Sequence, residues 1–234
     1  TNIYQWYKNG SPWTPPAGNS SNSNKLIFNN LQVSDAGTYH VRVTNPGAPA
    51  LTLYGRAVRL VVQPDVNSCR YQDSLVLVAL YNATNGSAGW YNKWNLGTPM
   101  PTWYGIFTNA QGCVEKIDMD GNPDGNFSFG GGNNLTGVLP VVLGNLSVLQ
   151  TLCIAHNKIG GVLPADLGKL SKLQYFYAHG NNFTGSIPST FGDLAALIYL
   201  QLGFNQLSGP IPSTLGKLNK LVWLNLMRNQ LSGS

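Results

Sequence analysis

A repeat of 24 residues in the second half of the chain constrains the fold more than any other feature. Full copies begin at Leu146, Leu170 and Leu194, and a shorter copy begins at Leu218. An upstream half-copy, NNLTGVLPVVLGN, fits the same register at residues 133–145. A fixed period of this length predicts a stack of similar units, and each unit must bury its apolar residues against its neighbours because one unit alone has too few.

Asparagine, glycine and proline recur at fixed places in the repeat. The recurring positions are Asn157, Asn181, Asn205 and Asn229, then Gly161, Gly185, Gly209 and Gly233, then Pro164, Pro188 and Pro212. Buried amides in one column are expected to satisfy the backbone groups of the turns through a ladder of hydrogen bonds. The glycines permit a bend after the ladder, and the prolines mark a return segment that is extended or short helical.

The full pattern resembles a known repeat family. The matched residues, with equivalents in every copy, are Leu170, Leu173, Phe176, Asn181, Phe183, Gly185, Ile187, Pro188, Phe191 and Gly192. They resemble the leucine-rich repeat, in the version that carries a G-x-[IL]-P segment, and the resemblance spans about half of the chain. It implies a mainly β solenoid over residues 114–234, with a parallel β-sheet on its concave face and extended or 3-10 return segments.

Residues 69–113 are similar to the N-terminal cap of such solenoids. Asp73 is a helix start signal, an apolar run follows, and Asn85-Gly86 is a stop signal, so a helix is predicted between them. A tryptophan-containing segment, TWYGIFTNAQGCVEKIDM, then leads into the first repeat. A cap is expected because the end of a solenoid otherwise exposes its core.

The cysteines of the cap depart from the pattern of plant family members, in which cysteines flank the tryptophan. Pro101 and Thr108 stand at those places here. We expect a disulfide between Cys69 and Cys113, which would tie the helix to the first repeat strand, and two buried thiols are the alternative. Cys153 lies on the row of its repeat that does not face the core and is expected to be unpaired.

Residues 1–63 read as short strands separated by turn signals, followed by a linker at 64–68. The stretch from Asp35 to Tyr39 resembles the D-x-G-x-Y corner of an immunoglobulin-like sandwich, and Trp6 resembles the core tryptophan of an earlier strand. Val41 replaces the expected cysteine, so no disulfide joins the sheets. The strands that normally precede Trp6 are missing and the last repeat is short, so we expect a piece of a longer protein.

Composition indicates an exported protein and argues against a partner made of nucleic acid. Only 10% of residues are charged, against about 25% in typical soluble domains. The net charge of +5 is modest and the lysines are scattered over the return segments, whereas nucleic acid requires a concentrated basic stripe. No apolar run approaches the about 20 residues that a membrane-spanning helix needs.

The alternation of side chains along each repeat strand predicts a binding surface. Core leucines point inward, and the alternate residues line the concave face. Because parallel strands lie about 4.8 Å apart, Tyr175, Tyr199 and Trp223 are expected to form a continuous aromatic ladder. The predicted binding residues are Tyr175, Tyr177, His179, Tyr199, Gln201, Phe204, Trp223, Asn225 and Arg228. Aromatic residues with polar groups around them are typical of recognition surfaces, and the alternative is that they only stabilise the sheet.

Enzymatic and metal chemistry are not expected. Glu115 is the one glutamate, and no carboxylate faces it across a cleft. His156 and His179 lie one repeat apart, but two histidines make a poor metal site. The stretch from Asp118 to Asn126 mimics a calcium loop, yet Pro123 and Phe129 stand where glycine and glutamate are required, which favours an insertion at 123–133 in the first repeat. We therefore predict no metal, no cofactor and no enzyme.

Two functions remain open from the sequence. In the first, the protein is an extracellular or cell-surface recognition module that binds a protein or a glycan through its concave face, as in large bacterial adhesin-like proteins. In the second, it is a structural subunit of an extracellular filament and binds further copies of itself through the same surface. A plant-like receptor ectodomain is less favoured because the cap lacks its paired cysteines.

Overall fold

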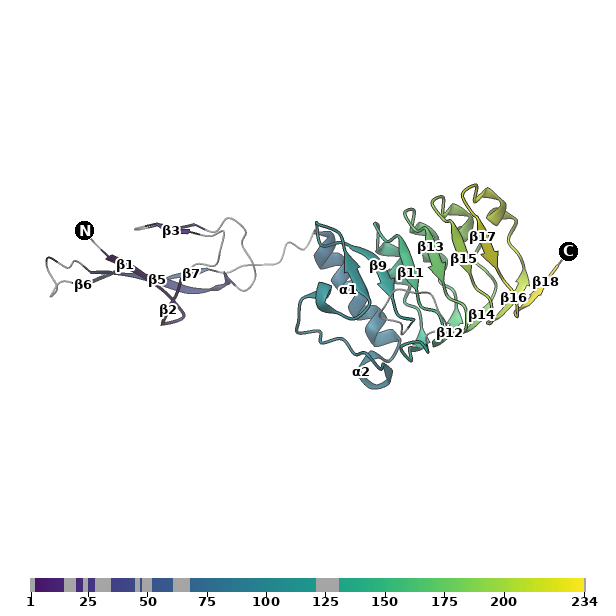
Figure 1. Ribbon diagram of the computed structural model, residues 1–234, viewed down its shortest axis with the longest axis horizontal. Helices are drawn as coiled ribbons and strands as arrows, with labels where there is room; N and C mark the ends of the chain where they lie inside the picture. Colours follow the sequence, from purple (N-terminus) through teal and green to yellow (C-terminus); the bar gives the residue numbers. More distant parts are fainter. Residues whose placement is uncertain are drawn as a thin grey trace. The chain divides into compact units, whose positions relative to one another are not determined.

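The computed structural model describes residues 3–14, 20–22, 25–27, 35–44, 47, 52–60, 68–120 and 131–233. The chain divides into two compact units, Thr1–Asp65 and Val66–Ser234 (Figure 1). Most of the predicted linker and most of the predicted insertion, at 64–67 and 123–130, lie outside the described residues.

The first unit is built of short antiparallel strands. Its main sheet has the order β2-β1-β5-β6, with β7 also paired to β5, and β3 pairs with β4. The strands are β1 (Ile3–Lys8), β2 (Ser11–Pro12), β3 (Ser20–Asn22), β4 (Lys25–Ile27), β5 (Gly37–Thr44), β6 (Thr52–Tyr54) and β7 (Val58–Leu60). Asn9 and Gly10 both have positive φ angles, 51° and 86°, as the tight hairpin between β1 and β2 requires.

The two residues that suggested an immunoglobulin-like domain lie on neighbouring strands. Trp6 on β1 is opposite Val41 on β5, and Tyr39 on β5 donates a hydrogen bond from its hydroxyl to the backbone oxygen of Asp35. Trp6 is only half-buried, although Tyr39 is buried. The immunoglobulin-like sandwich itself stays a prediction.

The second unit is a solenoid with two parallel sheets. The concave sheet has the order β8-β9-β11-β13-β15-β17, in which only β8 runs antiparallel to its neighbour. Its strands are β8 (Ile106–Thr108), β9 (Val114–Asp118), β11 (Thr151–Cys153), β13 (Tyr175–Tyr177), β15 (Tyr199–Gln201) and β17 (Trp223–Asn225). The alternating pattern predicted the repeat strands β9, β11, β13, β15 and β17, whereas β8 lies in the tryptophan-containing segment of the cap.

The return segments contain a second sheet that the sequence analysis did not resolve. Its order is β10-β12-β14-β16-β18. The strands are β10 (Thr136–Val138), β12 (Lys158–Val162), β14 (Asn182–Gly185), β16 (Gln206–Pro210) and β18 (Gln230–Ser232). The first four precede the 3-10 turns η3 (Val141–Asn145), η4 (Ala165–Lys169), η5 (Ser189–Asp193) and η6 (Ser213–Lys217), respectively. The 3-10 turns pack closely: a Cβ atom on Gly168 would lie 2.3 Å from the backbone oxygen of Thr190 in the next repeat.

The asparagine column forms the predicted ladder, and each amide bonds to two repeats. The side-chain oxygen of Asn181 accepts from the backbone N–H of Ile159, at 3.0 Å, in the preceding repeat. Its side-chain N–H donates to the backbone oxygens of Ile154 and Ala178, one in each repeat. Asn205 and Asn229 repeat this arrangement.

The ladder continues into the cap through Asn133, which the predicted insertion had included. Asn133 is fully buried, and its backbone N–H donates to the side chain of Asn157 at 3.0 Å. Its own side-chain oxygen accepts from the backbone N–H of Asn92 in the cap. Asn133 therefore belongs to the first repeat.

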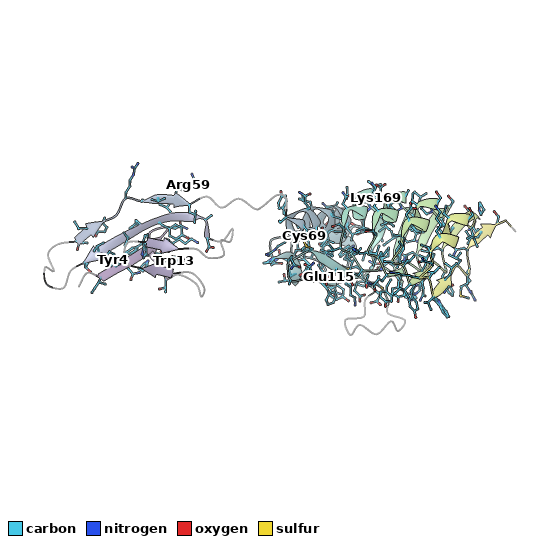
Figure 2. All side chains as sticks on the ribbon, turned by 90° about the horizontal axis from the view of Figure 1, so that it is seen from above. Tyr4, Trp13, Arg59, Cys69, Glu115 and Lys169 are labelled. Atoms are coloured by element: carbon cyan, nitrogen blue, oxygen red, sulfur yellow. A yellow bond between two sulfur atoms is a disulfide. The ribbon has the colours of Figure 1, made fainter. Side chains whose placement is uncertain are left out.

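The cap consists of α1 (Cys69–Ala83), α2 (Gly86–Gly89), the 3-10 turn η2 (Met100–Thr102) and strand β8. Its core is aromatic: Trp94 contacts the rings of Tyr81, Trp90 and Trp103. Each of the three indole N–H groups donates to a backbone oxygen, so the burial of the tryptophan rings leaves none of their N–H groups unsatisfied. Cys69 and Cys113 form a disulfide that joins the start of α1 to the residue before β9 (Figure 2).

The start of the cap helix differs from the prediction. Ser68 is the N-cap residue, and its hydroxyl accepts from the backbone N–H of Tyr71. Asp73 is instead buried inside α1, where its carboxylate accepts a 2.8 Å hydrogen bond from the backbone N–H of Val114 on β9. Burial raises the pKa of the Asp73 carboxyl, and the hydrogen bond from Val114 opposes this shift only in part. Asp73 thus fastens the cap helix to the first repeat.

The first prediction concerns Asp73. Asp73→Ala leaves the buried N–H of Val114 without an acceptor and should lower the free energy of unfolding by about 1–3 kcal/mol. Asp73→Asn keeps an acceptor oxygen and removes a desolvated charge. Because the folded-state pKa is raised above 3.8, the folded protein holds this proton more tightly and wild type loses stability as pH rises through that pKa. Asp73→Asn should therefore match or exceed wild type at neutral pH.

Urea unfolding of the three proteins at neutral pH and at about pH 4 measures both effects. The advantage of Asp73→Asn over wild type should shrink at the lower pH. A wild type that is more stable than Asp73→Asn at neutral pH would contradict the proposed balance between burial and hydrogen bonding.

The second prediction concerns the ladder. Asn181→Ala leaves the buried N–H of Ile159 without its acceptor, and the backbone oxygens of Ile154 and Ala178 each lose one of two amide donors. It should lower the free energy of unfolding by about 1–3 kcal/mol. The matched control is Asn182→Ala, because Asn182 is exposed and a surface substitution usually changes stability by less than about 0.5 kcal/mol. Equal denaturation midpoints for the two variants would show that the ladder does not stabilise the solenoid.

Candidate functional site

Strand register places six of the nine predicted binding residues on the concave sheet, and His179, Phe204 and Arg228 follow the strands. Tyr175, Tyr199 and Trp223 are register partners on β13, β15 and β17, and their neighbours Phe176, Leu200 and Leu224 form the alternate row. Phe176 and Leu200 are fully buried in the core. The odd and even side chains of these strands therefore point to opposite faces of the sheet.

The aromatic ladder is shorter than predicted. The rings of Tyr175 and Tyr199 stack, with centroids 5.6 Å apart and planes at 28°. Trp223 occupies the next register position and is 54% exposed. Within the part of the chain that the structure describes, no ring contact joins Trp223 to Tyr199 and no hydrogen bond engages the hydroxyl of Tyr175 or Tyr199. These two hydroxyls and the Trp223 ring are therefore available to a partner.

Tyr177 lies on the predicted row but is not an exposed contact. It is only 6% exposed, and it packs with Cys153 and Ala155 beneath Tyr175 and Tyr199. Burial, with the neighbouring Cys153 as a smaller cause, raises the pKa of Tyr177 to about 12. The small side chains of Cys153 and Ala155 leave room for a large ring beside them. Tyr177 supports the surface from below.

The two amides of the predicted surface differ in availability. The side-chain oxygen of Asn225 accepts from the backbone N–H of Met227 at 3.1 Å, so this amide is partly used by its own turn. Gln201 is half-buried at the middle of the same row. Met227, which the prediction left out, is 54% exposed beside them.

The two histidines contact each other through their rings. The rings of His156 and His179 meet edge to face, with centroids 4.7 Å apart and planes at 85°. Burial, aided by His156, lowers the pKa of His179, which keeps this ring neutral at neutral pH. Its Nδ1 atom is buried and makes no hydrogen bond to the described residues. We read the pair as a packing contact at the edge of the sheet.

The residue before each ladder asparagine adopts a left-handed backbone. Glycine takes this conformation freely, and Gly132 and Gly180 occupy it in two repeats. His156, Phe204 and Arg228 occupy the same place in three others, with φ angles of 54°, 56° and 52°. A residue with a Cβ atom is disfavoured here by about 1–2 kcal/mol, so the side chains at these corners are retained against a local strain.

Two of these corner residues join the aromatic row. The guanidinium of Arg228 lies 5.1 Å from the ring centre of Phe204, and both side chains are exposed. Together, Tyr175, Tyr199, Phe204, Trp223 and Arg228 form what we call the concave aromatic surface. It combines stacked rings, exposed apolar area and one cation.

The third prediction tests the strain at a corner. Phe204→Gly relieves the left-handed backbone, whereas Phe204→Ala removes the ring but keeps a Cβ atom. The glycine variant should therefore be more stable than the alanine variant by about 1 kcal/mol in urea unfolding. Gln206 on β16 is the control, since glycine in an extended strand should be less stable than alanine. The same order at both positions would contradict the strain.

The comparisons with known proteins identify the repeats. The family model described as "Leucine rich repeat" matches residues 179–231, and a second model of the same description matches residues 148–170. Leucine-rich repeats are thus confirmed within residues 148–170 and 179–231 of the solenoid. The G-x-[IL]-P version of the repeat and a bacterial origin stay predictions. No curated protein matches the chain significantly.

Several solved structures are similar to the chain. A structure of the BIR3–SERK2 complex from Arabidopsis thaliana shares 27% identity with a TM-score of 0.57, over 69% of this chain and 84% of that one. A structure of PEPR1–AtPEP1 shares 25% identity with a TM-score of 0.50, over 69% of this chain and 25% of that one. A plant ice-binding protein, at 23% identity and a TM-score of 0.59 over 70% of this chain and 50% of that one, shows the shared fold alone.

Proposed function

We propose that this protein is an extracellular recognition module that binds a protein partner through the concave aromatic surface. The observation that carries the proposal is the placement of Phe204 and Arg228 at left-handed corners where glycine would be unstrained. Residues held in such conformations concentrate at functional sites, because the strain is otherwise removed by substitution. The side chains of Phe204 and Arg228 are exposed and add nothing to the leucine core, so their role lies at the surface.

The composition of the surface fits a protein partner. Tyrosine, tryptophan and arginine are enriched at the energetic centres of protein interfaces, where large rings are buried and charged groups find partners. Tyr175 and Tyr199 offer rings with unused hydroxyls, Trp223 offers a large exposed ring, and Arg228 offers a cation above Phe204. A concave sheet of a solenoid presents these groups along an extended surface.

The similar structures support the same class of function. The BIR3–SERK2 structure is a complex of two named proteins, and the PEPR1 structure names AtPEP1 together with PEPR1. The low charge and the cap disulfide suit an extracellular protein. No helix in the described part of the chain is long and apolar enough to cross a membrane. The test must distinguish a protein partner from a glycan ligand and from self-association into a filament.

The fourth prediction is a cross-linking experiment. A photoreactive amino acid placed at Tyr199 should cross-link the partner in the native setting, and the same group placed at Val162 should not, because Val162 is exposed on β12 of the other sheet. Mass spectrometry of the cross-linked product distinguishes a protein, a glycan and a second copy of this chain. Cross-linking of the same protein at equal yield from both positions would contradict the proposed surface.

The affinity for the partner identified in this way completes the test. Tyr199→Ser and Trp223→Ser should each weaken binding by about 30-fold, the loss expected for a central interface residue worth about 2 kcal/mol. Val162→Ser is the matched control and should bind as wild type does. A dissociation constant unchanged in both surface variants would refute the role of the aromatic residues. Concentration-dependent growth of the isolated protein in light scattering would favour the filament instead.

A further inference from the structure

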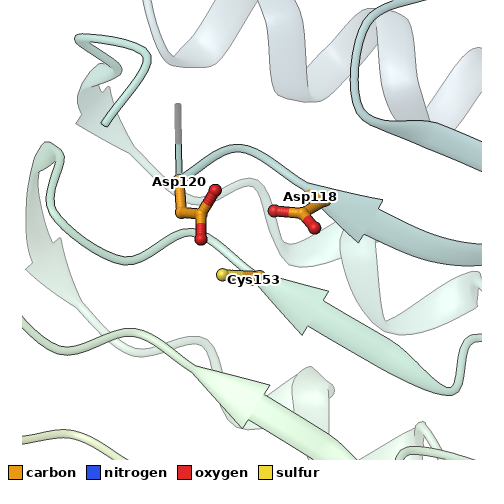
Figure 3. A group of neighbouring side chains, drawn as sticks. All are labelled: Asp118, Asp120 and Cys153. Atoms are coloured by element: carbon orange, nitrogen blue, oxygen red, sulfur yellow. The ribbon is translucent and has the colours of Figure 1, made fainter. Parts of the chain in front are cut away.

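Three potential metal ligands meet at the first-repeat end of the concave sheet. They are Asp118 at the end of β9, Asp120 just after it, and Cys153 at the end of β11. One ligand atom of each lies within 4.8 Å of the others. Figure 3 shows both carboxylates directed toward the region around the sulfur of Cys153. None of the three was assigned to the recognition surface.

All three side chains are buried, which is unusual for acidic residues. Asp118 is 8% exposed, Asp120 is 6% exposed and Cys153 is 1% exposed. Buried carboxylates normally have a partner for each oxygen, because an uncompensated buried charge is costly. We therefore ask which groups compensate the buried carboxylates of this cluster.

One oxygen of Asp118 lacks such a partner among the described residues. Its Oδ2 atom forms an ion pair with Lys116 at 2.8 Å. Its Oδ1 atom is buried and makes no hydrogen bond to any described residue, although the side chain is 91% buried. A buried oxygen with an unused lone pair, next to a second carboxylate and a thiol, is suited to bind a cation.

We propose that Asp118, Asp120 and Cys153 form a binding site for one divalent transition-metal ion of the zinc type. Zn²⁺ accepts cysteine sulfur and aspartate oxygen together, whereas Ca²⁺ and Mg²⁺ are bound by six or more oxygen atoms. On binding, the thiol releases its proton to solvent and becomes a thiolate ligand. Two carboxylates and one thiolate carry three negative charges, which Zn²⁺ and Lys116 together neutralise.

The geometry needs only a small adjustment. Zinc bonds of about 2.0–2.3 Å in a tetrahedral site place neighbouring ligand atoms roughly 3.3–3.8 Å apart, so the ligands must close by about 1 Å. The backbone holds the three residues in place for this. Cys153 is the register partner of Asp118, and the backbone oxygen of Asp120 accepts from the N–H of Gly132. Three protein ligands leave a fourth position open for water or for a group of a partner.

The site is independent of the concave aromatic surface, and its test does not require the partner. Untagged protein, with the Cys69–Cys113 disulfide intact, is stripped with a chelator and titrated with Zn²⁺ and separately with Co²⁺. Elemental analysis after dialysis should give one zinc per chain. Co²⁺ should produce a thiolate-to-metal charge-transfer absorption in the near ultraviolet, which reports a cobalt–sulfur bond directly.

Three variants assign the ligands. Cys153→Ser should abolish the charge-transfer band, and the nearly isosteric Asp120→Asn should weaken zinc binding by more than the about 10–100-fold that loss of an outer-shell partner causes. Asp193→Asn removes an exposed carboxylate on η5 and should bind zinc as wild type does. Circular dichroism checks folding, and Asp120→Asn carries the test alone should Cys153→Ser not fold.

Several results would overturn the proposal. They are the failure of folded wild-type protein to retain stoichiometric zinc, a charge-transfer band that persists in Cys153→Ser, and equal zinc affinity for Asp120→Asn and wild type. Tight binding of Ca²⁺ with no response to Co²⁺ would likewise exclude a site that uses the thiol.

Discussion

The hydrogen bonds of the buried asparagines hold the solenoid together and set the position of everything on its surface. Each ladder amide accepts from the backbone of the preceding repeat and donates to the backbone of both repeats. A buried turn without these bonds would leave several polar groups unsatisfied, which the small leucine core of one repeat cannot offset. The amides therefore fix the distance and the register between repeats, and the concave strands inherit that register.

Because the register between repeats is fixed, the residues that lie on the concave face can be identified from the sequence. Tyr175, Tyr199 and Trp223 were predicted to be neighbours because the period places them at the same point in successive repeats, and the strands pair them in that order. The ladder asparagines were predicted by the same argument. A periodic sequence predicts the contacts between units because each contact recurs in every repeat. The cap helix was predictable for a different reason, since its formation depends on residues that are close in the sequence.

The features that the sequence did not predict depend on contacts that do not recur from repeat to repeat. Asp73 was predicted to start a helix, but its carboxylate accepts a hydrogen bond from the backbone N–H of Val114, on a strand far along the chain. Tyr177 read as exposed, but the rings of Tyr175 and Tyr199 cover it because Cys153 and Ala155 beside it are small. The left-handed corners also escaped notice, since a histidine, a phenylalanine and an arginine stand where the repeat otherwise places glycine. The sequence analysis placed Cys153 on the row that does not face the core and Asp118 at the start of a calcium-like stretch, yet only the coordinates show that their ligand atoms converge with that of Asp120.

At the left-handed corners, the exposed side chain of a repeat can change without a change in the fold of the repeat. The backbone at this place is the same whether the residue is Gly180, Phe204 or Arg228, and the leucines and the amide ladder behind it do not change. Natural variation can therefore sample new side chains at one point per repeat while the scaffold stays constant. A family of such chains can therefore change its binding specificity one repeat at a time along the solenoid.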